Sequence, residues 1–129
     1  MLEPLHKWPK NLSKKLLVAF IVGYLNYCGE PVRPKDVYWI YLDFFPSDPP
    51  EIVSNCISLL RRAGHLKRIR RGFYEVTHSG WKYLSYMYLL KQPPLPGFMK
   101  NVFEYVVRYY PPYGLEIKIG DEDEKWSLV

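Results

Sequence analysis

Apolar side chains recur every three or four residues along most of the chain, and this spacing predicts a mainly helical protein. The first helix is expected to run from a cap at Asn11 or Ser13 to about Tyr27. Its apolar positions form a stripe broad enough for a buried helix: Leu16, Leu17, Phe20, Ile21, Tyr24 and Leu25. Gly29 and Pro31 end it, because glycine suits a helix C-terminus and proline cannot continue a helix.

Two further helices follow. The second is predicted to begin at Pro34 and to turn Val37, Ile40, Tyr41 and Phe44 inward. The third is predicted over residues 49–63, with Asp48 as its N-cap and Glu51 at the matching capping-box position. This third helix has two chemically different faces. The inner face is apolar (Val53, Cys56, Ile57 and Leu60), and the outer face is polar (Glu51, Ser54, Asn55, Ser58 and Arg62).

A short hairpin and a fourth helix come next. Residues 65–69 and 73–77 are predicted to be strands, joined by a turn at Arg71 and Gly72. Thr77 can cap a helix that runs to about Leu90, and Gly80 would let that helix approach the hairpin closely. This fourth helix is apolar on nearly every side, so either the C-terminal segment or a second subunit must cover it.

The C-terminal segment starts with a proline-rich break at residues 93–97, which separates it from the fourth helix. Residues 98–110 then have helical spacing, with strand as the less favoured alternative because β-branched and aromatic residues are frequent. Residues 115–119 alternate and can form a short strand. The acidic run at residues 121–124 is most simply a solvated tail, although it can also screen the basic hairpin of a neighbouring molecule.

The distribution of charge divides the chain into a basic part and a slightly acidic part. Residues 1–91 hold 14 Lys/Arg and 7 Asp/Glu, a net charge of +7; residues 92–129 hold 4 and 6, a net of −2, which gives the overall +5. The hairpin region is the most basic, because no acidic residue interrupts the cations between residues 61 and 71: Arg61, Arg62, Lys67, Arg68, Arg70 and Arg71. Such a cluster favours contact with phosphates over simple solubility.

The order of these elements resembles the winged helix-turn-helix family. The resemblance rests on a third helix that ends in Leu60-x-x-x-Gly64, a strand, a basic tip at residues 70–72, a strand that ends at Thr77, and Gly80 three residues later. It covers roughly residues 12–91 and implies an α+β, mainly helical fold: a three-helix core, a two-stranded wing and here an additional C-terminal helix. The domain would then span residues 12–91, after an N-terminal arm (1–11) and before a C-terminal extension (92–129).

The resemblance also implies binding to double-stranded DNA, with the third helix in the major groove and the wing at residues 67–72 on the backbone or in the minor groove. The residues expected to contact bases lie on the outer face of the third helix: Ser54, Asn55, Ser58 and Arg62. Among them, Asn55 can pair with adenine through two hydrogen bonds. Glu51 either caps the helix or accepts a hydrogen bond from cytosine, and the cap is preferred. The expected backbone contacts are Arg33, Lys35, Arg61, Lys67, Arg68, Arg70 and Arg71.

We expect a homodimeric transcriptional regulator that pairs through residues 78–110, because this apolar region exceeds what one small domain can cover. The alternative is a winged-helix module that binds protein within a transcription or replication assembly. The polar outer face of the third helix favours DNA.

Other classes of function find little support in the sequence. Its three histidines are scattered, no metal-binding spacing or glycine-rich phosphate loop occurs, and we expect neither an enzyme nor a bound cofactor or metal. The longest apolar run, residues 16–27, is too short to cross a bilayer, so a cytoplasmic protein is expected, at the nucleoid or in the host cytoplasm if viral. Cys28 and Cys56 are expected to be buried thiols, with a disulfide as the less favoured alternative.

Overall fold

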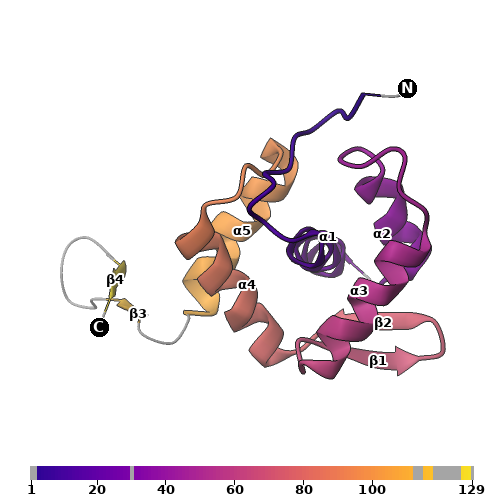
Figure 1. The fold of residues 1–129 in the computed structure, drawn as a ribbon. Coiled ribbons are helices and arrows are strands. Elements are labelled where there is room, and N and C mark those ends of the chain that lie inside the picture. The colour runs from indigo at the N-terminus through magenta and orange to yellow at the C-terminus, as the bar shows by residue number, and fades with distance from the viewer. Residues whose placement is uncertain (1–2, 30, 112–114, 118–125, 129) are drawn as a thin grey trace.

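The computed structural model describes residues 3–29, 31–111, 115–117 and 126–128. This part of the chain contains five helices, with a two-stranded antiparallel hairpin between the third and the fourth (Figure 1). The predicted α+β, mainly helical class is therefore confirmed. In chain order the elements are α1 (Lys14–Cys28), α2 (Pro34–Tyr41), α3 (Glu51–Arg62), β1 (Leu66–Arg70), β2 (Phe73–Val76), α4 (His78–Lys91), α5 (Gly97–Tyr109), β3 (Leu115–Ile117) and β4 (Trp126–Leu128).

The centre of the molecule is α1, which Figure 1 shows nearly end-on with the other four helices arranged around it. Every residue from Leu16 to Gly23 is buried, so this helix has no solvent face over two turns. The backbone N–H of Leu16 donates to the Ser13 hydroxyl at 3.0 Å, which confirms Ser13 as the cap. The expectation of a buried first helix is confirmed.

The turn between α2 and α3 differs from the predicted capping arrangement. Asp48 does not cap α3; the N-cap is Pro50, which makes no side-chain cap bond, and the helix begins at Glu51 instead of residue 49. The Asp48 carboxylate instead accepts hydrogen bonds from Lys14 Nζ at 2.8 Å and from the Tyr41 hydroxyl at 2.7 Å. The predicted capping box was wrong because these two long-range donors hold the carboxylate, and it thereby ties the start of α3 to α1 and α2.

The hairpin is short and bent, and a third segment extends it. Leu66 faces Val76 and Lys67 faces Glu75, but Ile69 is an extra residue between the pairs that Arg68 and Arg70 make. Gly72 has a φ of +80°, as the predicted turn requires. Val32 forms an isolated antiparallel bridge with Tyr74, through backbone hydrogen bonds of 2.8 and 2.9 Å. A segment between α1 and α2 therefore pairs with β2 and leaves β1 as the free edge.

Two contacts fix α4 against the hairpin as the sequence predicted. The backbone N–H of Gly80 donates to the Thr77 hydroxyl at 3.0 Å, which caps the helix. A Cβ atom at Gly80 would collide with the backbone carbonyl of His65 and lie 2.8 Å from a Val76 methyl group. Glycine at this position is therefore what allows α4 to dock.

The C-terminal helix α5 covers part of α4 and joins the same core. The rings of Phe20 and Phe103 meet edge to face at 4.8 Å between centroids, and the Tyr88 hydroxyl donates to Glu104 at 3.0 Å. Burial and the bond to Glu104 raise the pKa of Tyr88 to about 12. The predicted helix at residues 98–110 is confirmed, and one core runs from the N-terminal arm (Trp8) through α1 to α5.

Two smaller expectations were only partly right, and a third agrees with the structure. Both cysteines are free, but Cys28 is exposed at the end of α1 while Cys56 is buried under α3. The expected strand at residues 115–119 is found as β3, which pairs antiparallel with β4, whereas residues 118–119 and the acidic run at 121–124 lie outside the described residues. Within residues 3–11 no helix or strand forms, as expected for an arm.

Candidate nucleic-acid interface

The structure confirms the two predicted faces of α3, one buried and one exposed. Val53, Cys56, Ile57 and Leu60 are buried against the core. The four residues expected to contact bases are all exposed, and within the described part of the chain their side chains make no hydrogen bond or ion pair: Ser54, Asn55, Ser58 and Arg62. Their donors and acceptors are therefore available to a ligand. Glu51 is also exposed in the first turn, where a carboxylate suits the helix dipole.

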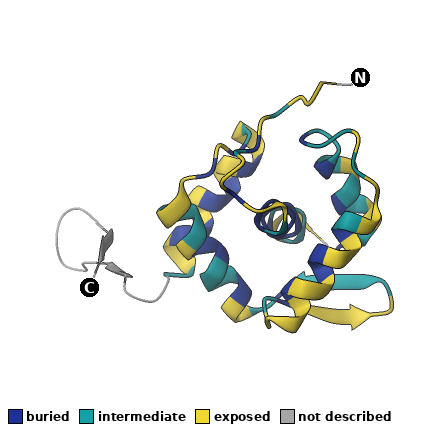
Figure 2. Cartoon of the chain, viewed as in Figure 1, coloured by how far each residue is buried: buried dark blue, intermediate teal, exposed yellow. Residues whose placement is uncertain are grey.

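The hairpin continues this exposed surface. In Figure 2 the edge strand β1 is exposed along most of its length, whereas β2 beside it is mostly half-buried. Arg68 and Arg71 are exposed, and among the described residues their side chains have no ion-pair partner. Lys67 lies 3.2 Å from the Glu75 carboxylate, and the Arg70 guanidinium lies 4.1 Å above the Phe73 ring. The ring fixes the direction of Arg70 without neutralising its charge.

The predicted contacts at the start of α2 are placed less favourably. The Arg33 guanidinium donates twice to Asp36, at 3.1 Å from both Nε and Nη2. The hydrogen bond from Arg33 lowers the pKa of Asp36, so this carboxylate stays ionised and competes with any phosphate for Arg33. Lys35 is exposed one position beyond the start of the helix. Of the two, Lys35 is the cation that is free to meet a phosphate.

Two contacts that hold the α3–hairpin unit in place were not predicted. The Asn26 side-chain oxygen accepts a hydrogen bond from the Val76 backbone N–H at 2.9 Å, which ties β2 to α1. His65, between α3 and β1, stacks on Tyr83 with ring centroids 4.1 Å apart and planes 13° apart. Burial lowers the pKa of His65, which favours the neutral ring. The only sequence signal for the contact of Asn26 was that a single asparagine stands within an apolar helix.

One exposed side chain of α3 did not feature in the sequence prediction. Leu59 is 46% exposed although its neighbours along the inner face are buried. It lies one turn after Asn55 and three residues before Arg62, so it borders the polar face. The sequence pattern assigned Leu59 to neither face of the helix, and the structure shows that it faces solvent.

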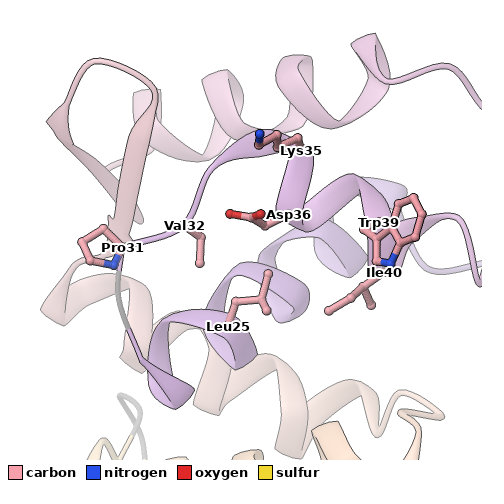
Figure 3. A pocket seen from close by; sticks show the side chains of 7 residues that line it. All are labelled: Leu25, Pro31, Val32, Lys35, Asp36, Trp39 and Ile40. Carbon is pink, nitrogen blue, oxygen red and sulfur yellow. The ribbon is translucent and has the colours of Figure 1, made fainter.

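A second surface with a different composition lies along α2. A groove of about 590 Å³ opens between the end of α1, the segment at Pro31 and Val32, and the outer side of α2 (Figure 3). Its walls are mainly apolar, with Leu25, Ile40 and Trp39, and Lys35 and Asp36 supply the charges. Trp39 is 77% exposed, which is unusual for so large a side chain. Such a surface suits an apolar partner more than a phosphate.

Among the described residues, no three His, Cys, Asp or Glu side chains come close enough together to hold a metal ion. None of the helices in that part of the chain is long and apolar enough to cross a membrane. Comparison with protein families, curated proteins and solved structures finds no match to this chain.

Proposed function

We propose that the chain is a winged helix-turn-helix protein that binds double-stranded DNA. In this proposal α2 and α3 form the helix-turn-helix, α3 enters the major groove, and the β1–β2 hairpin is the wing. The short bridge between Val32 and Tyr74 supports this reading, because it joins the wing to the segment that precedes α2. This bridge holds the wing against the helix-turn-helix, so that the wing and α3 can meet neighbouring features of a duplex.

The observation that carries the proposal is the continuity of the exposed polar face of α3 with the cationic hairpin. Four side chains with free hydrogen-bonding groups stand on α3, and Arg61, Arg68 and Arg71 beside them have no partner in the described chain. Short polar groups can reach base edges while the flanking cations contact phosphates. A surface that served only solubility would not separate these two chemistries so clearly.

We further propose that the protein acts as a homodimeric regulator of transcription. After α4 and α5 have packed together, several large side chains of residues 78–110 remain exposed: Tyr86, Leu90, Phe98, Tyr105 and Tyr109. A second copy can cover them, and two copies related by a two-fold axis would read two half-sites about one helical turn of DNA apart.

Binding of the wild-type protein to a random-sequence duplex, measured by fluorescence anisotropy at two salt concentrations, tests the proposal. We expect binding that weakens steeply as salt rises, because counterions are released when cations contact phosphates. Absence of binding at low salt would overturn the proposal.

A second candidate function is a winged-helix module that binds protein. The exposed Trp39 and the apolar groove on α2 are the observations that favour it. The two candidates differ in the effect of Trp39→Ala, which should leave DNA affinity unchanged if α3 and the wing are the functional surface and should weaken binding of a protein partner if the groove is.

A further inference from the structure

Leu59 stands out because it is the one large apolar side chain that α3 exposes to solvent. Its neighbours on the exposed side are Asn55 one turn before it, Ser58 directly before it, Arg62 three residues after it and Ala63 one turn after it. Asn55, Ser58 and Ala63 are shorter than leucine, so Leu59 projects beyond these three, while the longer Arg62 lies beside it. A single exposed leucine is common on proteins, but this one borders the face that the proposed function places in the major groove.

The major groove of DNA offers one apolar group, the 5-methyl group of thymine. The other groups that a side chain can contact along the major-groove edges of the base pairs are hydrogen-bond donors or acceptors. A leucine that projects into this groove therefore gains free energy only where a thymine methyl group meets it. Where a G·C pair lies at that position instead, the leucine leaves a donor or acceptor of the base pair without a hydrogen-bond partner.

We infer that Leu59 is a specificity-determining residue that selects thymine by contact with its methyl group, beside the base that Asn55 reads. This inference rests on the proposed function. One turn of helix advances about 5.4 Å, and successive base pairs are about 3.4 Å apart, so Leu59 reaches one or two steps from the Asn55 contact. The preferred half-site therefore holds a thymine within two steps of the base pair that Asn55 contacts.

Replacement of thymine by uracil tests the inference, because it removes the methyl group and keeps every hydrogen-bonding group. The probe is the tightest-binding duplex selected from random sequences, prepared once with thymine and once with uracil. Burial of one methyl group predicts about a fourfold weaker binding of the wild-type protein to the uracil duplex for each methyl group that the protein touches. Uracil placed at one position at a time then locates the contact.

Two variants separate Leu59 from its neighbours. Leu59→Ala should bind the thymine and uracil duplexes equally, and because the side chain is half exposed and alanine favours helix, the fold should persist by circular dichroism. Leu59→Asn, which keeps the size but not the apolar surface, should behave in the same way. Asn55→Ala is the matched control, which should bind more weakly but keep the difference between thymine and uracil.

The outcomes separate this inference from the proposed function. Equal binding of the wild-type protein to both duplexes would overturn the role of Leu59 while leaving DNA binding intact. A thymine preference that survives in Leu59→Ala would also overturn it, because another residue would then contact the methyl group. Failure to bind any duplex at low salt would overturn the proposed function itself.

Discussion

The outer surfaces of α3 with its hairpin and of α4 with α5 are built from opposite chemistry. The first exposes short polar groups and six cations, of which Lys67 pairs with an acidic side chain and Arg70 lies on an aromatic ring. The second exposes a pair of large side chains at helical spacing on each helix: Tyr86 and Leu90 on α4, and Tyr105 and Tyr109 on α5. Charge that has no partner among the described residues suits a polyanion, whereas apolar area suits another protein surface.

Both surfaces depend on the same central helix. α1 lies between them and buries residues of both sides, and Gly80 and His65 bring α4 against the end of α3 (Figure 1). One small core therefore orients two different surfaces without a separate domain for each.

The largest effect is expected from the α5 contribution to the core. Phe103→Ala should lower the free energy of unfolding by about 3–5 kcal/mol, because the ring is fully buried against Phe20 and its removal leaves a cavity. Phe98→Ala, on the same helix but 43% exposed, is the control and should cost much less. Urea titration measures both. Equal costs would show that α5 is not part of the common core.

The apolar surface of α4 and α5 should govern assembly. In a homodimer, replacing both Tyr105 and Tyr109 by glutamate should weaken association by at least about 2 kcal/mol, because charge would enter a contact built from aromatic rings. Sedimentation at micromolar concentration compares the variant with the wild-type protein. A wild-type protein that sediments as a 15.4 kDa monomer would contradict the dimer.

Asn55 should act on sequence discrimination and not on stability. Asn55→Ala should cost about 1–3 kcal/mol on the selected duplex and much less on random duplex, because the paired hydrogen bonds to adenine form only at the preferred site. Anisotropy with the two duplexes measures the difference. An equal reduction in affinity for both duplexes would make Asn55 a backbone contact.

The smallest effect is expected at Asp48, whose carboxylate positions the start of α3 through two hydrogen bonds. Burial raises the pKa of Asp48, but the hydrogen bonds from Lys14 and Tyr41 outweigh burial, and the pKa is lowered. Asp48 therefore stabilises the fold above its unfolded pKa of about 3.9. That stability is lost as pH falls through the lower folded value.

Asp48→Asn should cost about 0.5–1.5 kcal/mol at neutral pH and less in acid, as measured by thermal unfolding at several pH values. Asp43→Asn removes a carboxylate from the same loop without breaking either bond, so it serves as the control. An equal cost of Asp48→Asn at neutral and acid pH would contradict this role of the carboxylate.

The sequence predicted those features that local patterns determine. The apolar period placed all five helices, and the caps at Ser13 and Thr77 and the turn at Gly72 followed from residue chemistry at the ends of elements. Asp48 was misjudged because its partners lie 34 residues before it in Lys14 and 7 before it in Tyr41, and local spacing carries no information about them. The bridge from Val32 to Tyr74 was missed for the same reason.

The candidate site was predicted in its polar part and missed in its apolar part. Ser54, Asn55, Ser58 and Arg62 were placed correctly on the exposed face because polar residues at helical spacing face solvent. Leu59 was assigned to neither face, since an apolar residue at the border of a core stripe can be buried or exposed, and only the packing around α3 decides which. The pairing of Arg33 with Asp36 likewise depends on side-chain geometry at the start of α2.

We propose that the hairpin cations, and not the overall charge, contact DNA. The most direct test is the salt dependence of duplex binding by Arg70→Ala/Arg71→Ala beside Lys91→Ala/Lys100→Ala. Both pairs remove two exposed cations and the same net charge, but the second pair lies on α4 and α5.

We predict that the slope of log affinity against log salt falls by about 0.9 for each phosphate that the first variant no longer binds, and stays at the wild-type value in the second variant. Equal slopes in the two variants would contradict the assignment of the α3–hairpin surface to DNA.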